Sequence, residues 1–221
     1  MSASTNPPTQ ARSIATRARL LSAAVDALVA EGYAGASTTN IAKRAKVSQG
    51  ALFKHFPSKH ALLGDALQQL FTELVEDFRG RLVRDQRADR LGAAIRILWD
   101  IFCSPTLQAA FELYLAARTD RELASIVTPV LAAHRQNLLA EARALFPDAA
   151  RQNPDFDAMI LSIMNMMQGA ALAASVIPTE DDSDRELALI ERIARQELLR
   201  GLVAGAGTRS TAVTDPTKGS V

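Results

Sequence analysis

The sequence predicts an all-α fold. Apolar residues recur three and four positions apart over most of the 221-residue chain, which is the spacing that places them on one face of a helix. No stretch alternates apolar and polar residues as a half-buried β-strand does, and no internal repeat is visible. Apolar residues make up 48% of the chain, which is enough for a hydrophobic core.

The first predicted helix begins at Ser13, after a polar tail, residues 1–12, that we expect to be disordered. The apolar residues of this helix keep to one broad face, so we expect that face to be buried. Gly32 and Gly35 follow the last of them and are expected to end the helix.

The stretch 38–56, TTNIAKRAKVSQGALFKHF, predicts two short helices joined by a tight turn. Thr38 and Ser48 are expected to cap the N-termini of the two helices. Phe56 precedes Pro57, which is expected to end the second helix. Two short helices joined in this way form a helix-turn-helix, whose second helix lies in the major groove of DNA.

The two faces of the second helix differ in chemistry. Leu52, Phe53 and Phe56 are expected to turn toward the first helix. The other face suits DNA, because Gly50 and Ala51 let the backbone approach base edges, and polar side chains there can bind phosphates and bases. The predicted DNA contacts are Thr38, Thr39, Lys46, Ser48, Gln49, Gly50, Ala51, Lys54, His55 and Lys59. The alternative from this stretch alone is a helical hairpin with a solvated polar face.

Charge is unevenly distributed along the chain. Through Leu62 there are 8 basic and 2 acidic residues, a net charge of +6, whereas the remainder has 17 basic and 22 acidic residues, a net charge of −5; together they give the formal +1 of the whole chain. A basic region followed by an acidic one is typical of a protein that binds a polyanion with one end.

Over Ile14–Leu63 the chain resembles the TetR family of bacterial transcriptional repressors. The resemblance rests on ATRARLLSAAVDALVAEGY followed by STTNIAKRAKVSQGALFKHFPSKHALL. It implies a three-helix DNA-binding head, residues 13–57, joined to a larger helical ligand-binding and dimerisation domain, residues 58–204. Residues 205–221, rich in Gly, Ser and Thr, are expected to form a mobile tail.

Two residues depart from the family pattern. Lys46 stands where the family commonly has a glycine in the turn, and a lysine at positive φ would cost about 1 kcal/mol. Phe53 stands where a tyrosine is common, so a phosphate contact from a phenol hydroxyl is absent.

The larger domain is predicted to consist of long helices. Ser58 is expected to cap the first of them, which would link the head to the second domain, and Pro129 is expected to kink or split the fourth. An acidic loop, Glu180–Asp184, is interpreted as a solvated turn. The predicted helices are 58–84, 89–103, one from Pro105, 121–146, 156–176 and 185–203.

Aromatic and polar residues on these helices are candidates for a ligand pocket, since such pockets are mostly apolar with a few placed polar groups. The candidates are Phe71, Phe78, Trp99, Phe102, Cys103, Phe111, Tyr114, His134, Asn165 and Gln168. The alternative for each aromatic residue is plain core packing, and for His134 a satisfied core histidine.

The helix at 156–176 is apolar on more than one face, which is too much for a helix with one side in water. In the TetR family the last two helices pair with their copies across a two-fold axis. The residues that the resemblance assigns to this dimer interface are Met166, Gly169, Ala170, Ala173, Ile190, Ala194 and Leu198. The alternative is that the two helices are the core of a monomer.

Enzyme functions have little support. The chain has three histidines and one cysteine, and it contains neither a nucleophile-elbow serine nor a glycine-rich phosphate loop. Nothing supports a metal site or a cofactor. No signal peptide is visible, and the longest weakly polar run, Gly169–Ile177, is too short to cross a bilayer, so a cytoplasmic protein is expected without a membrane partner.

The sequence therefore predicts a homodimeric DNA-binding regulator, specifically a repressor that a small apolar ligand releases from a palindromic operator. Two alternatives stay open. One is an activator or a non-inducible regulator of the same fold. The other is a helical ligand-binding protein that no longer binds DNA.

Overall fold

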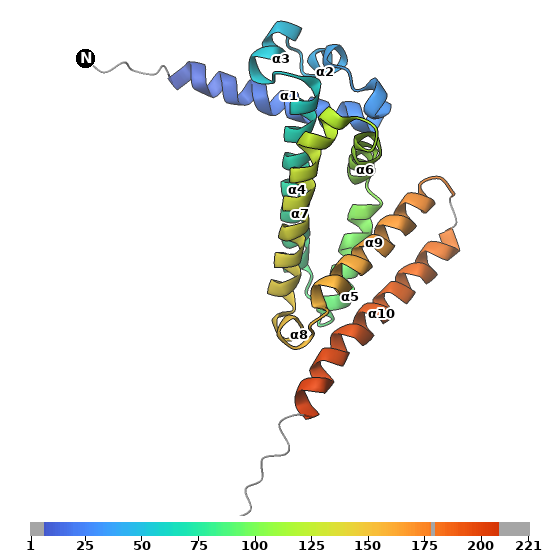
Figure 1. The fold of residues 1–221 in the computed structure, drawn as a ribbon. Coiled ribbons are helices and arrows are strands. Elements are labelled where there is room, and N and C mark those ends of the chain that lie inside the picture. The colour runs from blue at the N-terminus through green and yellow to red at the C-terminus, as the bar shows by residue number, and fades with distance from the viewer. Residues whose placement is uncertain (1–6, 178–179, 208–221) are drawn as a thin grey trace, which may run out of the picture. The chain divides into compact units, whose positions relative to one another are not determined.

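The computed structural model describes residues 7–177 and 180–207, and every regular element within them is an α-helix (Figure 1). This confirms the predicted all-α fold. Most of the predicted tails, residues 1–6 and 208–221, lie outside the described residues. The helices are α1 Pro7–Gly35, α2 Thr38–Arg44, α3 Gln49–His55, α4 Lys59–Arg84, α5 Arg90–Phe102, α6 Pro105–Ala117, α7 Arg121–Leu145, α8 Pro147–Gln152, α9 Phe156–Ala174 and α10 Glu180–Gly207.

The chain divides into two compact units, Met1–Gln136 and Asn137–Val221. The division falls within α7. In the first unit α4 and α6 pack with α1, and α5 packs with α4 and α6. The sequence placed its boundary at residue 57, between a DNA-binding and a ligand-binding domain; that functional division stays a prediction.

The first unit is built around α1, which packs against α2, α4 and α6. Figure 1 shows α1 crossing the end of α4 at which α2 and α3 also lie. The core there consists of fully buried aliphatic side chains. They include Leu20, Ala24 and Ala27 of α1 and Leu62, Leu63 and Leu67 of α4.

Helix α1 begins at Pro7, so the prediction that residues 7–12 are disordered was wrong. Proline is favoured in the first turn of a helix, and nothing in the residues that follow it breaks the helix. Gly32 interrupts α1 as predicted: its φ of 68° and ψ of −178° are not helical. The chain then turns helical again as far as Gly35.

The predicted starts of the central helices are confirmed. The hydroxyl of Ser58 accepts a hydrogen bond from the Ala61 amide at 3.1 Å, and Asp89 caps α5 in the same way. Pro105 lies in the first turn of α6. Pro129 lies inside α7, which remains one helix rather than two.

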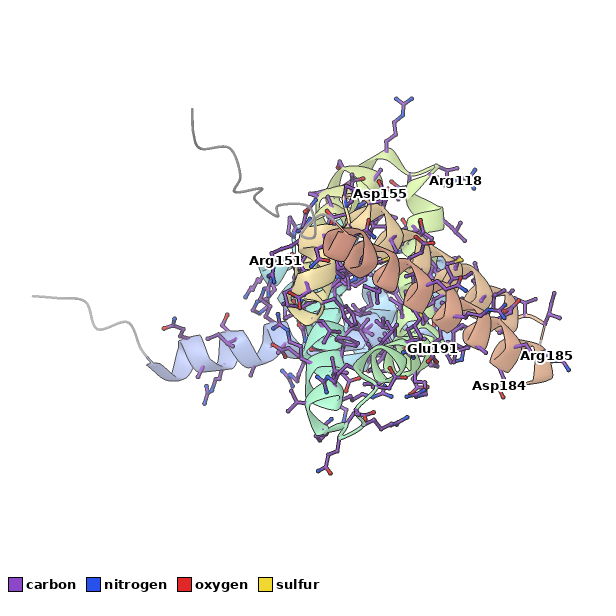
Figure 2. The ribbon with its side chains drawn as sticks, turned by 90° about the horizontal axis from the view of Figure 1, so that it is seen from below. Arg118, Arg151, Asp155, Asp184, Arg185 and Glu191 are labelled. Atoms are coloured by element: carbon purple, nitrogen blue, oxygen red, sulfur yellow. The ribbon has the colours of Figure 1, made fainter. Side chains whose placement is uncertain are left out.

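The second unit contains α8, α9 and α10, and α10 packs against both of the others. The sequence did not predict α8, because six residues are too few to show a period. It also placed the start of α10 too late: the helix begins at Glu180, so the acidic stretch is its first turns rather than a solvated loop. Figure 2 shows Asp184 and Arg185 on this end of α10, pointing away from the helix axis.

Helix α9 is long and apolar enough to cross a membrane, and 33% of its most apolar stretch is buried. One such helix is weak evidence for a membrane protein, because the core helix of a soluble protein passes the same test.

The contact between α4 and α7 can be tested at Gly64. A Cβ added to Gly64 would overlap Cγ2 of Ile126, whereas one added to Gly80 of the same helix would meet only Arg84, at 3.5 Å. Alanine is otherwise about 1 kcal/mol better than glycine inside a helix. We expect Gly80→Ala to raise the free energy of unfolding and Gly64→Ala to lower it by about 1–3 kcal/mol through overpacking. Urea unfolding of both variants would measure this, and equal gains would contradict the close packing.

Candidate nucleic-acid interface

Two serine caps define the helix-turn-helix. The hydroxyl of Ser37 accepts from the Asn40 amide at 3.2 Å at the start of α2, so the predicted cap at Thr38 was wrong by one residue. The hydroxyl of Ser48 accepts from the Ala51 amide at 3.1 Å at the start of α3, as predicted. Helix α3 ends at His55, and its C-cap is Phe56, whose φ of −135° and ψ of 122° are extended, as expected before a proline.

The turn between α2 and α3 places Lys46 at φ 55°, in the left-handed region. This is the conformation for which a glycine is common at that position. The Lys46 amide donates to Lys43 O at 3.1 Å and the Val47 amide donates to Ala42 O at 3.0 Å. The backbone therefore accepts about 1 kcal/mol of strain to make a tight turn that presents the lysine to solvent.

The two short helices are fixed by a small apolar core. Ile41, Leu52 and Phe56 are at most 1% exposed. The Arg17 guanidinium lies 5.2 Å from the centre of the Phe56 ring and also pairs with Asp65 of α4. This core decides which residues of α3 are left to face outward.

Helix α1 holds α2 through Glu31. The carboxylate of Glu31 accepts hydrogen bonds from the Asn40 side chain and from Arg44, both on α2. The hydrogen bond from Asn40, and then that from Arg44, lowers the pKa of Glu31. The orientation of the helix-turn-helix on the head is thus fixed by polar contacts as well as by the core.

The outward face of α3 carries most of the predicted DNA contacts. Gln49, Gly50 and Lys54 are exposed, and Ala51 and His55 are half-buried. Among the described residues, a Cβ added to Gly50 would meet nothing within 4 Å, so no contact there requires a glycine. The space beside this helix turn is open to a partner.

The remaining predicted contacts surround this face. Thr39, Lys46 and Ser48 are exposed, and Thr38 is half-buried. The Gln49 side-chain amide donates to the Thr39 hydroxyl at 2.7 Å, which links the first turns of α2 and α3.

One prediction about this face was wrong. Phe53 was expected to turn toward α2, but it is 49% exposed, next to Lys54. Lys59 stays a predicted phosphate contact; within the chain its ammonium donates to the Tyr33 carbonyl at 2.8 Å and lies 4.2 Å from the centre of the Tyr33 ring. Burial lowers the pKa of Lys59.

A polar network that the sequence did not reveal joins the head to α7. The Tyr33 hydroxyl donates to Asp120 at 2.9 Å and lies 3.2 Å from His60 Nε2. His60 Nε2 is 3.1 Å from Asp120, and its Nδ1 is 3.2 Å from Glu122. These residues are far apart in the sequence and form no local motif, so no pattern could have identified them.

Ionisation in this network follows from its contacts. Burial, followed by the hydrogen bond to Asp120, raises the pKa of Tyr33 to about 12. The backbone amide of Leu123, followed by the Tyr33 hydroxyl, lowers the pKa of Asp120. At neutral pH Tyr33 is therefore a donor and Asp120 a charged acceptor.

Comparison with known proteins agrees with this geometry. Residues 20–66 match the family described as bacterial regulatory proteins, tetR family. An uncharacterized HTH-type transcriptional regulator of Mycobacterium tuberculosis is 33% identical over 183 residues, which cover 82% of this chain and 93% of the relative. The chain belongs to the TetR family of bacterial regulatory proteins.

One further relative and one solved structure are similar to this chain. The HTH-type transcriptional repressor Rv3405c of Mycobacterium tuberculosis is 35% identical over 116 residues, covering 48% of this chain and 62% of the repressor. The crystal structure of the multidrug binding protein EbrR complexed with imidazole has the same fold, with a TM-score of 0.59 and 24% identity over 80% of this chain and 93% of EbrR. The relatives are named as transcriptional regulators rather than enzymes.

Eight residues predicted for the TetR-type ligand pocket lie in the first unit. Phe71, Phe102 and Phe111 are buried, and Phe78, Trp99, Cys103, Tyr114 and His134 are half-buried. The structure brings some of them together. The rings of Phe71 and His134 stack with their centres 3.8 Å apart, and those of Phe111 and Tyr114 meet edge to face at 6.1 Å.

His134 is the most informative of these residues. Its Nδ1 is buried and has no hydrogen-bond partner within the described part of the chain. Burial lowers the pKa of His134 to about 4, so the ring is neutral at physiological pH. The sequence left open that His134 is a core histidine with its hydrogen bonds satisfied, and the structure does not show that for Nδ1.

The other two predicted ligand residues, Asn165 and Gln168, lie on α9 in the second unit, where Asn165 is exposed. That unit has a groove of about 490 Å³ between the start of α9 and α10. Neither Asn165 nor Gln168 lines it; its walls include Met159, Ser162, Met166 and Ile193.

The residues predicted for the TetR-type dimer interface fall into two groups. Met166, Gly169 and Ala173 are exposed on α9, and Ala170 is half-buried. Ile190, Ala194 and Leu198 of α10 are at most 8% exposed within one chain. These three pack inside the chain, because α10 uses that face to cover α8 and α9.

The burial of a neutral His134 predicts how the free energy of unfolding changes in acid. Its pKa is about 4 in the folded chain and near 6.5 in the unfolded chain, so the unfolded chain binds more protons between these values. The stability from the neutral ring is complete above pH 6.5 and is lost as the pH falls toward 4. Urea unfolding at pH 7 and at pH 4.5 should therefore show a smaller acid-induced loss for His134→Gln than for the wild type. Equal losses would contradict the burial of a neutral ring.

Proposed function

We propose that the protein is a homodimeric repressor whose two α3 helices bind successive major grooves of a palindromic operator and that a small apolar ligand releases it. The observation that carries the proposal is the exposed face of α3, where Gln49, Gly50 and Lys54 point outward from a helix held by Leu52 and Phe56. The similarity to a repressor over 48% of the chain supports repression rather than activation.

In this proposal the contacts on DNA divide by chemistry. Lys46, Lys54 and Thr39 hold phosphates, because they are exposed and can donate to oxygen. Gln49, Gly50 and Ala51 meet base edges, where an amide can pair with adenine and small residues allow a close approach. Ser48 contributes mainly by capping α3, since its hydroxyl already accepts the Ala51 amide.

Helix α9 supports the dimer. Its exposed residues Met166, Gly169, Leu172 and Ala173 recur at helical spacing and form one apolar stripe with small residues in it. A Cβ added to Gly169 would meet nothing within 4 Å, so another helix can come close at that point. A dimer places two α3 helices at the spacing of neighbouring major grooves, about 34–36 Å or a multiple of it.

The release step rests on helix α4. It begins directly after the helix-turn-helix and carries Phe71, which stacks on His134 of α7. A ligand that favours a different arrangement of α4 and α7 would move the head. A coupling of about 1–3 kcal/mol would weaken DNA binding about 5- to 150-fold. The fold shared with the multidrug binding protein EbrR supports an effector of small-molecule size.

DNA binding can be tested with Lys54→Ala. Loss of this phosphate contact should weaken binding to every duplex, and it should flatten the plot of log affinity against log salt concentration by about one unit per subunit. The control Arg84→Ala also removes one positive charge, but at the C-terminal end of α4, roughly 38 Å along this helix from its start beside the helix-turn-helix. It should leave the plot unchanged. Mobility shifts with duplexes selected from the source genome would measure both. If Lys54→Ala changed only base preference, the phosphate assignment would be wrong.

The dimer can be tested with a matched pair of exposed leucines. Leu172 of α9 is 43% exposed and Leu115 of α6 is 57% exposed. In sedimentation at micromolar concentration the wild type and Leu115→Asp should be dimers, because Leu115 lies outside the α9 stripe. Leu172→Asp should be monomeric, because it buries an unpaired charge in the interface. A monomeric wild type would refute the proposed dimer.

A further inference from the structure

Phe53 lies exposed in the middle of the outward face of α3. Its neighbour in the sequence, Leu52, is fully buried, whereas Phe53 is 49% exposed. Gln49 and Gly50, one helical turn earlier, are exposed on the same side, and Lys54 follows directly. The apolar ring is therefore surrounded by the residues that we assign to DNA.

The chemistry of the ring limits what it can contact. Half of a phenylalanine side chain amounts to roughly 100 Å² of apolar surface. A phenyl ring has no hydrogen-bond donor for a phosphate oxygen. It gains from a partner only by covering apolar surface.

The major groove offers one prominent apolar group, the C5-methyl group of thymine. We propose that Phe53 reads a thymine methyl group in each half-site of the operator and so determines part of the sequence specificity. The proposal rests on the DNA-binding function proposed above and adds to it the identity of one base.

The local geometry supports a close approach of the ring to a base. Gly50, one turn away, carries no side chain that could hold the helix off the groove, and the space beside it is open. Gln49, the first residue of α3, is held by its hydrogen bond to Thr39 of α2. Lys54, adjacent to the ring, is exposed and can anchor a phosphate of the same groove.

The test removes the methyl group from the DNA and leaves the protein unchanged. A duplex is first selected from a random library with the wild-type protein, and each thymine of a half-site is then replaced by uracil. Uracil keeps the hydrogen-bonding groups of thymine and lacks only its methyl group. A replacement in one half-site should weaken wild-type binding about fourfold, which is the loss expected for one buried methyl group.

The protein variants assign this effect to the ring. Phe53→Ala should bind the thymine and uracil duplexes equally, so that the two changes are not additive. The control Val29→Ala shortens an apolar residue of α1 that is 42% exposed, and it should keep the fourfold difference. Phe53→Leu should keep part of it.

The outcomes separate this inference from the proposed function. Selection of a duplex whose half-sites lack thymine, or are insensitive to uracil at every position, would overturn the role of Phe53 and leave DNA binding intact. A Phe53→Ala variant as sensitive to uracil as the wild type would do the same. Failure to select any duplex would overturn both.

Discussion

The outward face of α3 depends on the burial of its inward face. A helix of seven residues is too short to be stable on its own in water, so α3 exists only because the chain around it fixes it. Leu52 of the helix and Phe56, its C-cap, provide this contact, and the Arg17 guanidinium lies against the Phe56 ring. Once these two side chains point inward, the positions of Gln49, Phe53 and Lys54 follow from the pitch of the helix.

Helix α1 connects the helix-turn-helix to the rest of the first unit. Glu31 accepts a hydrogen bond from Arg44 of α2, and Arg17 pairs with Asp65 of α4. The Tyr33 carbonyl accepts a hydrogen bond from the Lys59 ammonium. The Tyr33 hydroxyl also reaches Asp120, directly before α7. The DNA-facing helices are therefore connected by polar contacts to the helix that carries His134. A displacement of α7 against α4 would act on the head through these contacts, which gives the proposed release step a physical route.

In the second unit, α9 has apolar residues both in the core and on the surface. Helix α10 covers α8 and α9 with Ile190, Ala194 and Leu198, and this contact belongs to a single chain. Met166 and Leu172 of α9 remain exposed. A helix that is apolar on two sides can thus serve a core and an interface at once, which is how the proposed dimer would use it.

The sequence by itself determined the all-α fold, the helix-turn-helix, the caps at Ser48 and Ser58, and the end of α3 at its C-cap Phe56. Each of these depends on residues a few positions apart, since caps and helical periods are local. Only the tertiary structure decided that Phe53 faces solvent, that Lys59 binds Tyr33, and that Tyr33, His60 and Asp120 meet. In a seven-residue helix with apolar residues on adjacent sides, the local pattern does not show which side the core will cover. That choice is made by contacts with residues distant in the sequence.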